Sequence, residues 1–109
     1  MNIMNTKQAA KYFECISSPV RLDIFSLLIR YGSDGLVAGE IASKLDLPAS
    51  NLSFHLKALT HCQLISVEQE GRFLRYRANL ALMKRLAGYL TEQCCVAQTS
   101  DTDCKKEAV

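Results

Sequence analysis

Apolar residues recur at helical spacing in five segments of this chain, and breaker residues separate the segments. The predicted helices span residues 6–17, 20–31, 37–45, 50–61 and 79–95. Thr6 is placed to cap the first helix, and Pro19 stands at the start of the second, where proline is favoured. The turn Asp46-Leu47-Pro48 ends the third helix because the residue before a proline avoids the helical conformation. The pattern therefore predicts a mainly helical protein.

Two of these helices show which face is expected to be buried. The second carries a predicted apolar stripe at Leu22, Phe25, Leu28 and Ile29. In the fourth helix, Leu52, Leu56 and Leu59 recur at i, i+4 and i+7, which places all three on one side. The opposite side of that helix is short, polar and partly basic.

Two β-strands are expected between the fourth and fifth helices. Residues 64–69 and 72–78 are rich in strand-forming side chains, and Glu70-Gly71 between them is a two-residue turn of the hairpin type. Two short helices joined by a tight turn and followed by a hairpin form the layout of a winged helix-turn-helix. The predicted fold class is thus mainly α with a small β-hairpin, of the winged helix-turn-helix type.

In that layout the helix over residues 50–61 enters the major groove of double-stranded DNA. The candidate DNA-binding residues are Ser50, Asn51, Ser53, Phe54, His55, Lys57, Arg72 and Arg75. The side chains of Asn51, Ser53 and His55 suit base edges or phosphates, whereas Lys57 and the wing arginines suit phosphates. The alternative from chemistry alone is an ordinary solvated helix face beside a solvated strand.

Composition limits the remaining choices. A chain of 109 residues with 49% apolar and 22% charged residues fits one folded domain, which we place at residues 1–97, with 98–109 as a flexible tail that carries a candidate metalloid ligand. The net charge is only +2, but residues 40–85 hold seven basic and four acidic residues, a local balance of +3. No apolar run suits a membrane helix or a signal peptide, so we expect a cytoplasmic protein without a membrane partner.

Three motifs resemble those of the ArsR/SmtB family of metal-responsive repressors. They are the segment 14–28 with its Ser-Pro-Val-Arg-Leu run, the segment 52–59 and the segment 70–77. The resemblance covers residues 6–95 and implies a repressor that binds operator DNA as a homodimer. It also implies that the first and last helices form the subunit interface, with recognition helices roughly 34 Å apart. Gln63 departs from the family's usual glycine, so this residue must adopt a left-handed conformation or the helix must end differently.

The family also suggests where a signal is sensed. Its arsenic-responsive founders have a cysteine pair where this chain has Val37 and Gly39, and its zinc, cobalt and nickel sensors place histidines on the last helix, where this chain has none. Cys94, Cys95 and Cys104 remain, and they resemble the C-terminal cysteine site of other arsenite-sensing members. The resemblance implies trivalent arsenic, or antimony, as the effector that releases the DNA, with no organic cofactor.

Several alternatives stay open for these thiols. Soft thiolates also suit cadmium, lead or mercury, and a redox or persulfide sensor would need only two of them. An enzyme with Cys94 or Cys95 as nucleophile is disfavoured because no histidine lies nearby in sequence, so we expect no enzymatic activity. A further alternative is a protein-interaction module that does not bind DNA and is stabilised by a zinc ion bound to these cysteines. Cys15 and Cys62 are expected to be small buried residues. Of the two, Cys15 has the stronger claim to be an additional ligand. His61 is expected to be a surface residue.

Overall fold

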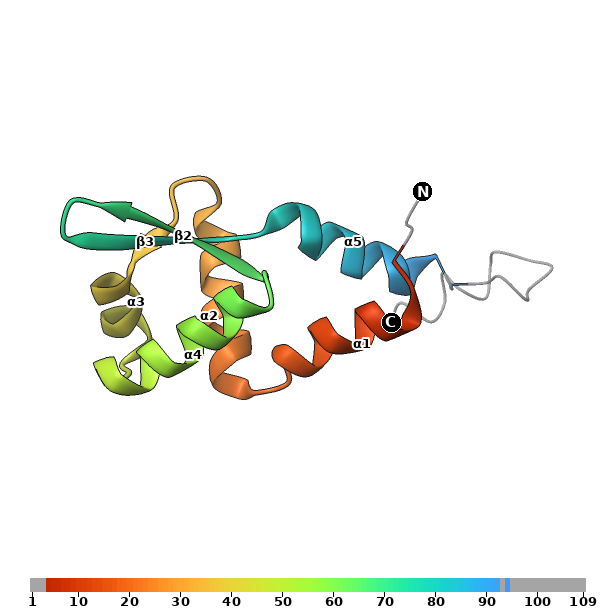
Figure 1. Ribbon diagram of the computed structural model, residues 1–109, viewed down its shortest axis with the longest axis horizontal. Coiled ribbons are helices and arrows are strands. Elements are labelled where there is room, and N and C mark those ends of the chain that lie inside the picture. Colours follow the sequence, from red (N-terminus) through yellow and green to blue (C-terminus); the bar gives the residue numbers. More distant parts are fainter. Residues whose placement is uncertain (1–3, 93, 95–109) are drawn as a thin grey trace.

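The computed structural model describes residues 4–92 and residue 94. The elements are α1 (Thr6–Cys15), α2 (Pro19–Tyr31), β1 (Leu36–Val37), α3 (Ala38–Leu45), α4 (Ala49–His61), β2 (Ile65–Glu70), β3 (Phe73–Ala78) and α5 (Leu80–Thr91). Their order confirms the predicted winged helix-turn-helix. In Figure 1 the hairpin of β2 and β3 lies with α3 and α4 at one end of the molecule, and α1 and α5 lie at the other.

The first helix is capped by Asn5, so the prediction that Thr6 caps it is wrong. The Asn5 side chain accepts from the backbone N–H of Gln8 at 2.8 Å, and the Asn5 N–H donates to the Gln8 side chain at 3.1 Å. This reciprocal pair satisfies two backbone donors at once, which one threonine hydroxyl does not achieve. The Thr6 hydroxyl instead shares a hydrogen bond of 2.7 Å with the Tyr89 hydroxyl on α5.

The hydrophobic core lies around α2 and α4. Leu52, Leu56 and Leu59 are buried as predicted. On α2, Phe25 and Leu28 are buried, but Leu22 is 48% exposed and its predicted place in the stripe is wrong. The buried arc of α2 includes Ile24 and Leu27 instead, because α3, α4 and β3 all pack against this helix and together cover a wider arc than one stripe.

A short strand that the sequence pattern missed widens the hairpin into a three-stranded sheet. β1 pairs with β3 and the order is β1-β3-β2, all antiparallel. Gly35, with φ of 61°, precedes this strand, and a Cβ there would collide with the backbone carbonyl of Tyr76. Only glycine accepts both the left-handed φ and this close approach.

The turn of the hairpin lies one residue later than predicted. Glu70 pairs with Phe73, so Gly71 and Arg72 form the turn and Glu70 belongs to β2. Gly71 has φ of 63°, as a two-residue turn with matching strand twist requires. The correction places Arg72 at the tip of the wing.

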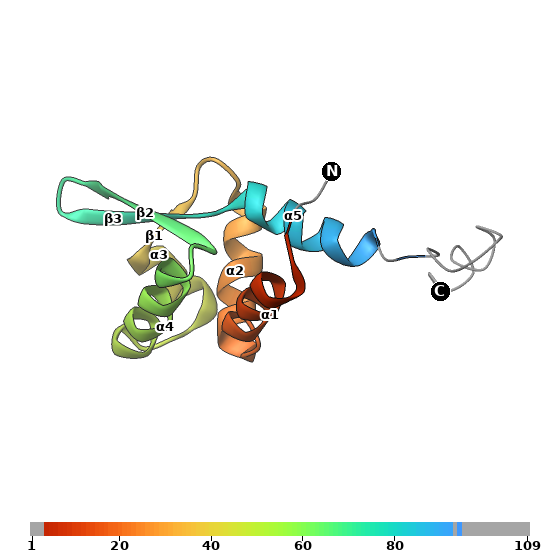
Figure 2. The ribbon, with the colours of Figure 1, turned by 45° about the vertical axis from the view of Figure 1, so that its right-hand side comes forward.

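The last helix is shorter than predicted. Asn79 caps α5 by accepting from the Leu82 N–H at 3.2 Å, and the helix ends at Thr91 rather than near residue 95. Cys94 therefore lies beyond the helix end, in a turn where its N–H donates to the Thr91 carbonyl. The start of α1 lies close to α5, where Thr6 and Tyr89 share their hydrogen bond, and the two helices diverge from there (Figure 2). None of the helices within the described residues is both long enough and apolar enough to span a membrane.

We expect the Leu59→Ala variant to lose about 2–5 kcal/mol of unfolding free energy, because Leu59 is fully buried where α4 meets the rest of the core. Urea denaturation followed by circular dichroism measures this loss. The matched Leu22→Ala variant should lose at most about 1 kcal/mol, since that side chain is half exposed. Equal losses in the two variants would contradict the placement of the core.

Candidate nucleic-acid interface

The connection between α3 and α4 fixes the angle between these two helices. Asp46 adopts a left-handed φ of 53°, and the Leu47 N–H donates to the Ala42 carbonyl at 3.0 Å. Pro48 then holds an extended conformation directly before α4, with φ of −60°. The tight turn leaves one side of α4 against the core and the other side facing solvent.

The outward side of α4 carries the predicted contact residues. Ser50, Asn51, Ser53, Phe54 and Lys57 are exposed, and His55 is partly buried at the edge of the face. Phe54 is 64% exposed, a large apolar ring among hydroxyl, amide and ammonium groups. We call this set of six residues the outer face of α4.

Arg21, near the start of α2, organises one edge of the outer face, and sequence reasoning did not single it out. Its Nε donates to His55 Nδ1 at 3.1 Å, and its guanidinium lies 5.7 Å from the centre of the Phe54 ring. Another guanidinium nitrogen donates to the Cys15 carbonyl at 3.3 Å. The signal was the Pro19-Val-Arg run, which indicated a helix start but not a contact across helices.

This contact decides which hydrogen bond His55 offers to a partner. Because Nδ1 accepts from Arg21, the neutral ring carries its proton on Nε2 and presents a donor there. Partial burial, and then the positive charge of Arg21, lower the pKa of His55 below its ordinary value. The side chain thus remains neutral at neutral pH and acts as a directed donor.

The arginines of the wing differ in what they are free to contact. Arg75 donates to Glu70 at 2.8 Å and to the Asp34 carbonyl at 3.0 Å, and the hydrogen bond from Glu70 raises the pKa of Arg75. Arg77 bridges a glutamate of β2 and the backbone before β1 in the same way. Both side chains therefore brace the sheet, whereas Arg72 stands in the exposed turn at the wing tip.

The predicted metalloid ligands fall largely outside the described residues. Cys94 is exposed, lies two residues after the cap Glu92 and is disulfide-bonded. Cys95 and Cys104 are outside the described part, as is the predicted tail of residues 98–109. Within residues 4–92 and 94, no three His, Cys, Asp or Glu side chains gather to hold a metal ion.

The two remaining cysteines are joined to each other. Cys15 at the end of α1 and Cys62 at the end of α4 form a disulfide, although 47 positions separate them. Both are partly buried against the core, as expected, but the sequence did not predict that they meet. His61 beside them is exposed, as predicted, and Gln63 adopts the left-handed conformation, with φ of 69°.

Comparisons with known proteins agree with this geometry. The family described as a helix-turn-helix domain matches residues 16–68. The HTH-type transcriptional regulator CmtR of Mycobacterium tuberculosis is 32% identical over 104 residues, 87% of this chain and 85% of CmtR. The transcriptional repressor SdpR of Bacillus subtilis is 33% identical over 72 residues, 66% of this chain and 77% of SdpR. A solved ArsR-like transcriptional regulator from Rhodococcus sp. RHA1 has a TM-score of 0.67 at 29% identity, covering 79% of this chain and 78% of that one.

The exposed recognition helix, the three-stranded wing and these matches define a winged helix-turn-helix DNA-binding protein. More narrowly, the chain belongs to the ArsR family of transcriptional regulators.

Stability is expected to depend on pH through His55. Its folded pKa lies below the ordinary 6.5, so between these two values the unfolded chain binds more protons than the folded chain. The unfolding free energy should therefore rise with pH through this window, and that gain should be lost as the pH falls through the folded pKa. Urea titrations between pH 5 and 8 should show a smaller rise for His55→Gln, whereas His61→Gln, which leaves Arg21 and His55 in place, should keep the native rise.

Proposed function

We propose that this protein is a homodimeric repressor that binds operator DNA through the outer face of α4 and is released when trivalent arsenic binds Cys94, Cys95 and Cys104. Antimony in the same oxidation state would act alike. The observation that carries the DNA-binding part is the polar outer face of α4, held in place by buried leucines on its other side.

The chemistry of this face suits the major groove. Asn51, Ser53 and the Nε2 donor of His55 can reach base edges, and the Phe54 ring offers apolar contact of the kind that thymine methyl groups accept. Lys57 and Arg72 are free to meet phosphates on either side of that contact. We therefore expect α4 to contact the bases directly. Lys57 and the wing tip would contact phosphates and so position the protein on the DNA.

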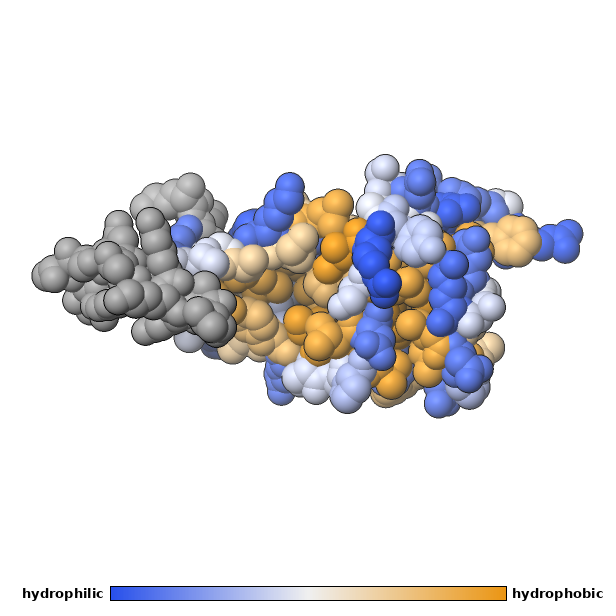
Figure 3. All heavy atoms as spheres, turned by 180° about the vertical axis from the view of Figure 1, so that it is seen from behind, coloured by the Kyte–Doolittle hydropathy of each residue, from blue (hydrophilic) through white to orange (hydrophobic). Residues whose placement is uncertain are grey.

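A second copy of the chain would cover the surface formed by α1 and α5. Leu90 on α5 is 56% exposed, and Figure 3 shows apolar side chains on the surface over the half of the molecule that these helices form. The Thr6–Tyr89 hydrogen bond already joins the two helices within one copy. Burying this surface between copies would set the spacing of the two recognition helices.

The position of Cys94 supports a sensor at the same end of the molecule. It lies three residues after Thr91, the last residue of α5, and its side chain is exposed. Trivalent arsenic takes three thiolates, and soft thiolates select such ions over harder ones. Drawing three sulfurs together there would alter the end of a dimer-forming helix and so the separation of the two DNA-reading heads.

The Lys57→Ala variant should bind every DNA sequence more weakly, because Lys57 is expected to contact a phosphate. The slope of log affinity against log salt concentration should fall by about 0.9 for each copy of Lys57 on the DNA. Fluorescence anisotropy at several salt concentrations measures this slope. Lys7→Ala on α1, which carries none of the outer-face residues, should leave the slope unchanged. An unchanged slope in Lys57→Ala would show that Lys57 does not contact the DNA.

Arsenite should release the reduced protein from a DNA fragment upstream of its own coding sequence. We expect the apparent Kd to rise at least about 5-fold, a common size for allosteric coupling. The Cys94→Ser, Cys95→Ser double variant should bind the same DNA and ignore arsenite. Anisotropy under reducing conditions, with zinc and cadmium as comparison ions, measures both effects.

The Cys62→Ser variant is the matched control, because it also removes a thiol but lies at the end of α4. It should still be released by arsenite. If neither arsenite nor cadmium releases the native protein, the sensor proposal fails while the regulator remains. Release by cadmium alone would instead indicate that the site responds to soft divalent ions.

A further inference from the structure

We propose that Cys15 and Cys62 form a second regulatory site, a thiol pair that hydroperoxides oxidise to a disulfide and that thereby adjusts DNA binding. This site is separate from Cys94, Cys95 and Cys104 and does not depend on the arsenic proposal, but it does rest on DNA binding by α4. The observation behind it is that the ends of α1 and α4 bring these two sulfurs within bonding distance.

The surroundings of the pair suit the reduced state as well as the oxidised one. The Ala58 carbonyl oxygen lies 3.7 Å from Cys15 Sγ and 3.2 Å from Cys62 Sγ, and the Leu59 carbonyl lies 3.5 Å from Cys62 Sγ. As thiols, both cysteines would have an S–H donor and an acceptor within reach. The pair can therefore change redox state without leaving a buried polar group unpaired.

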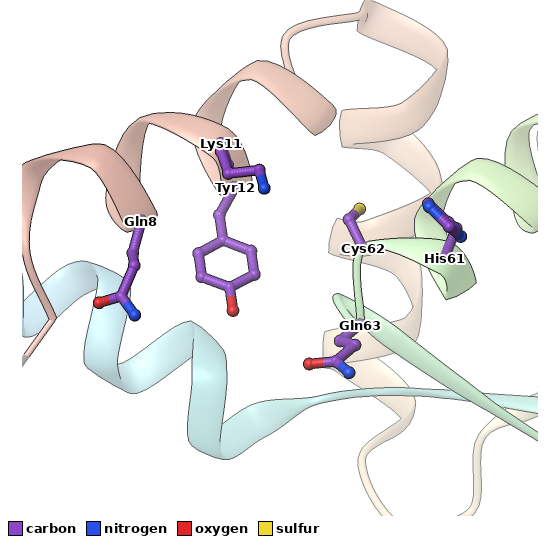
Figure 4. A pocket seen from close by; sticks show the side chains of 6 residues that line it. All are labelled: Gln8, Lys11, Tyr12, His61, Cys62 and Gln63. Atoms are coloured by element: carbon purple, nitrogen blue, oxygen red, sulfur yellow. The ribbon is translucent and has the colours of Figure 1, made fainter.

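Cys62 is the sulfur that a small oxidant would reach first. It lines a pocket of about 310 Å³ between α1 and the connection from α4 to β2. Figure 4 shows Gln8, Lys11 and Tyr12 of α1 on one side of this pocket and His61, Cys62 and Gln63 on the other. The pocket is open to solvent, so a small peroxide can enter it, and Lys11 is among its lining residues. Cys15 does not line the pocket, which fits it to be the second, resolving thiol.

The oxidation then balances as two thiols plus one hydroperoxide giving one disulfide, one water and one alcohol, or two waters from hydrogen peroxide. The Cys62 thiol gives up its proton, and the thiolate sulfur attacks a peroxide oxygen, so that an S–O bond forms as the O–O bond breaks. The departing alkoxide or hydroxide takes up that proton and leaves as alcohol or water. The Cys15 sulfur next attacks Cys62 Sγ, the S–S bond forms, and the oxygen leaves as water with the Cys15 proton. The two thiols together lose two electrons, and the peroxide gains them.

A short chain of contacts links this pair to the outer face of α4. The Cys15 carbonyl accepts from Arg21, and Arg21 in turn donates to His55 Nδ1 and lies over Phe54. α4 otherwise packs mainly on α2, α3 and β2, and the disulfide adds a covalent tie to α1. The bonded form fixes the Cys15 backbone under Arg21, so we expect it to hold His55 in place and to bind DNA more tightly than the dithiol form.

The test uses the full chain with Cys94→Ser, Cys95→Ser and Cys104→Ser, so that only Cys15 and Cys62 remain. This protein is treated with hydrogen peroxide or with dithiothreitol, and free thiols are counted by alkylation and intact mass. Anisotropy on the upstream DNA fragment then compares the two states of the same protein. We expect peroxide to remove two alkylatable thiols and to lower the Kd at least about 5-fold, and dithiothreitol to reverse both changes.

A fourth substitution, Cys62→Ser, provides the control, because it leaves Cys15 unable to form the bond. Its Kd should be the same after either treatment. Two thiols that stay alkylatable after peroxide would overturn the proposal. So would a disulfide that forms without changing the Kd, since the bond would then serve folding alone. Because this background lacks the arsenite ligands, its result is independent of whether arsenite releases the native protein.

Discussion

The burial of three leucines on one side of α4 is the constraint on which the DNA-binding end of the molecule depends. Leu52, Leu56 and Leu59 are each at most 2% exposed, and they fix the rotation of α4 about its own axis. With that rotation fixed, Asn51 and Lys57 can only face solvent. The helix ends at His61, and Gln63, in a left-handed conformation with φ of 69°, lies where the chain turns toward the wing.

Arg21 ties the pieces around α4 together. Its guanidinium donates hydrogen bonds to the Cys15 carbonyl and to His55 Nδ1, and it lies over the Phe54 ring. These three groups belong to α1 and α4. A lysine has no planar fork and could not satisfy this geometry. The arginine thus orients the imidazole as a donor while the backbone end of α1 anchors the arginine itself. One side chain thus links the position of α1 to the orientation of His55, a proposed DNA contact.

The cysteines of the described part lie at two places, where a bound ligand or a disulfide would act on different parts of the protein. Cys94 follows α5, where a ligand would act on the proposed contact between copies and so on the spacing of two heads. Cys15 and Cys62 lie inside one head, where a bond acts on α4 of the same copy. The two proposals therefore predict different responses: arsenite changes how two copies sit on DNA, and oxidation changes how firmly one copy presents His55.

The sequence by itself determined the order of the helices, the hairpin and the outer face of α4, because helical spacing and breaker residues act locally. The capping box of Asn5 and Gln8 is equally local, although the pattern was assigned to Thr6. The sequence could not determine that the residues after Gly35 add a strand to the sheet, or that Leu22 faces solvent. It also left Arg21 without a role and Cys15 apart from Cys62. These features were decided by tertiary packing, since each depends on groups that lie far apart in sequence and meet only when the helices close around one core.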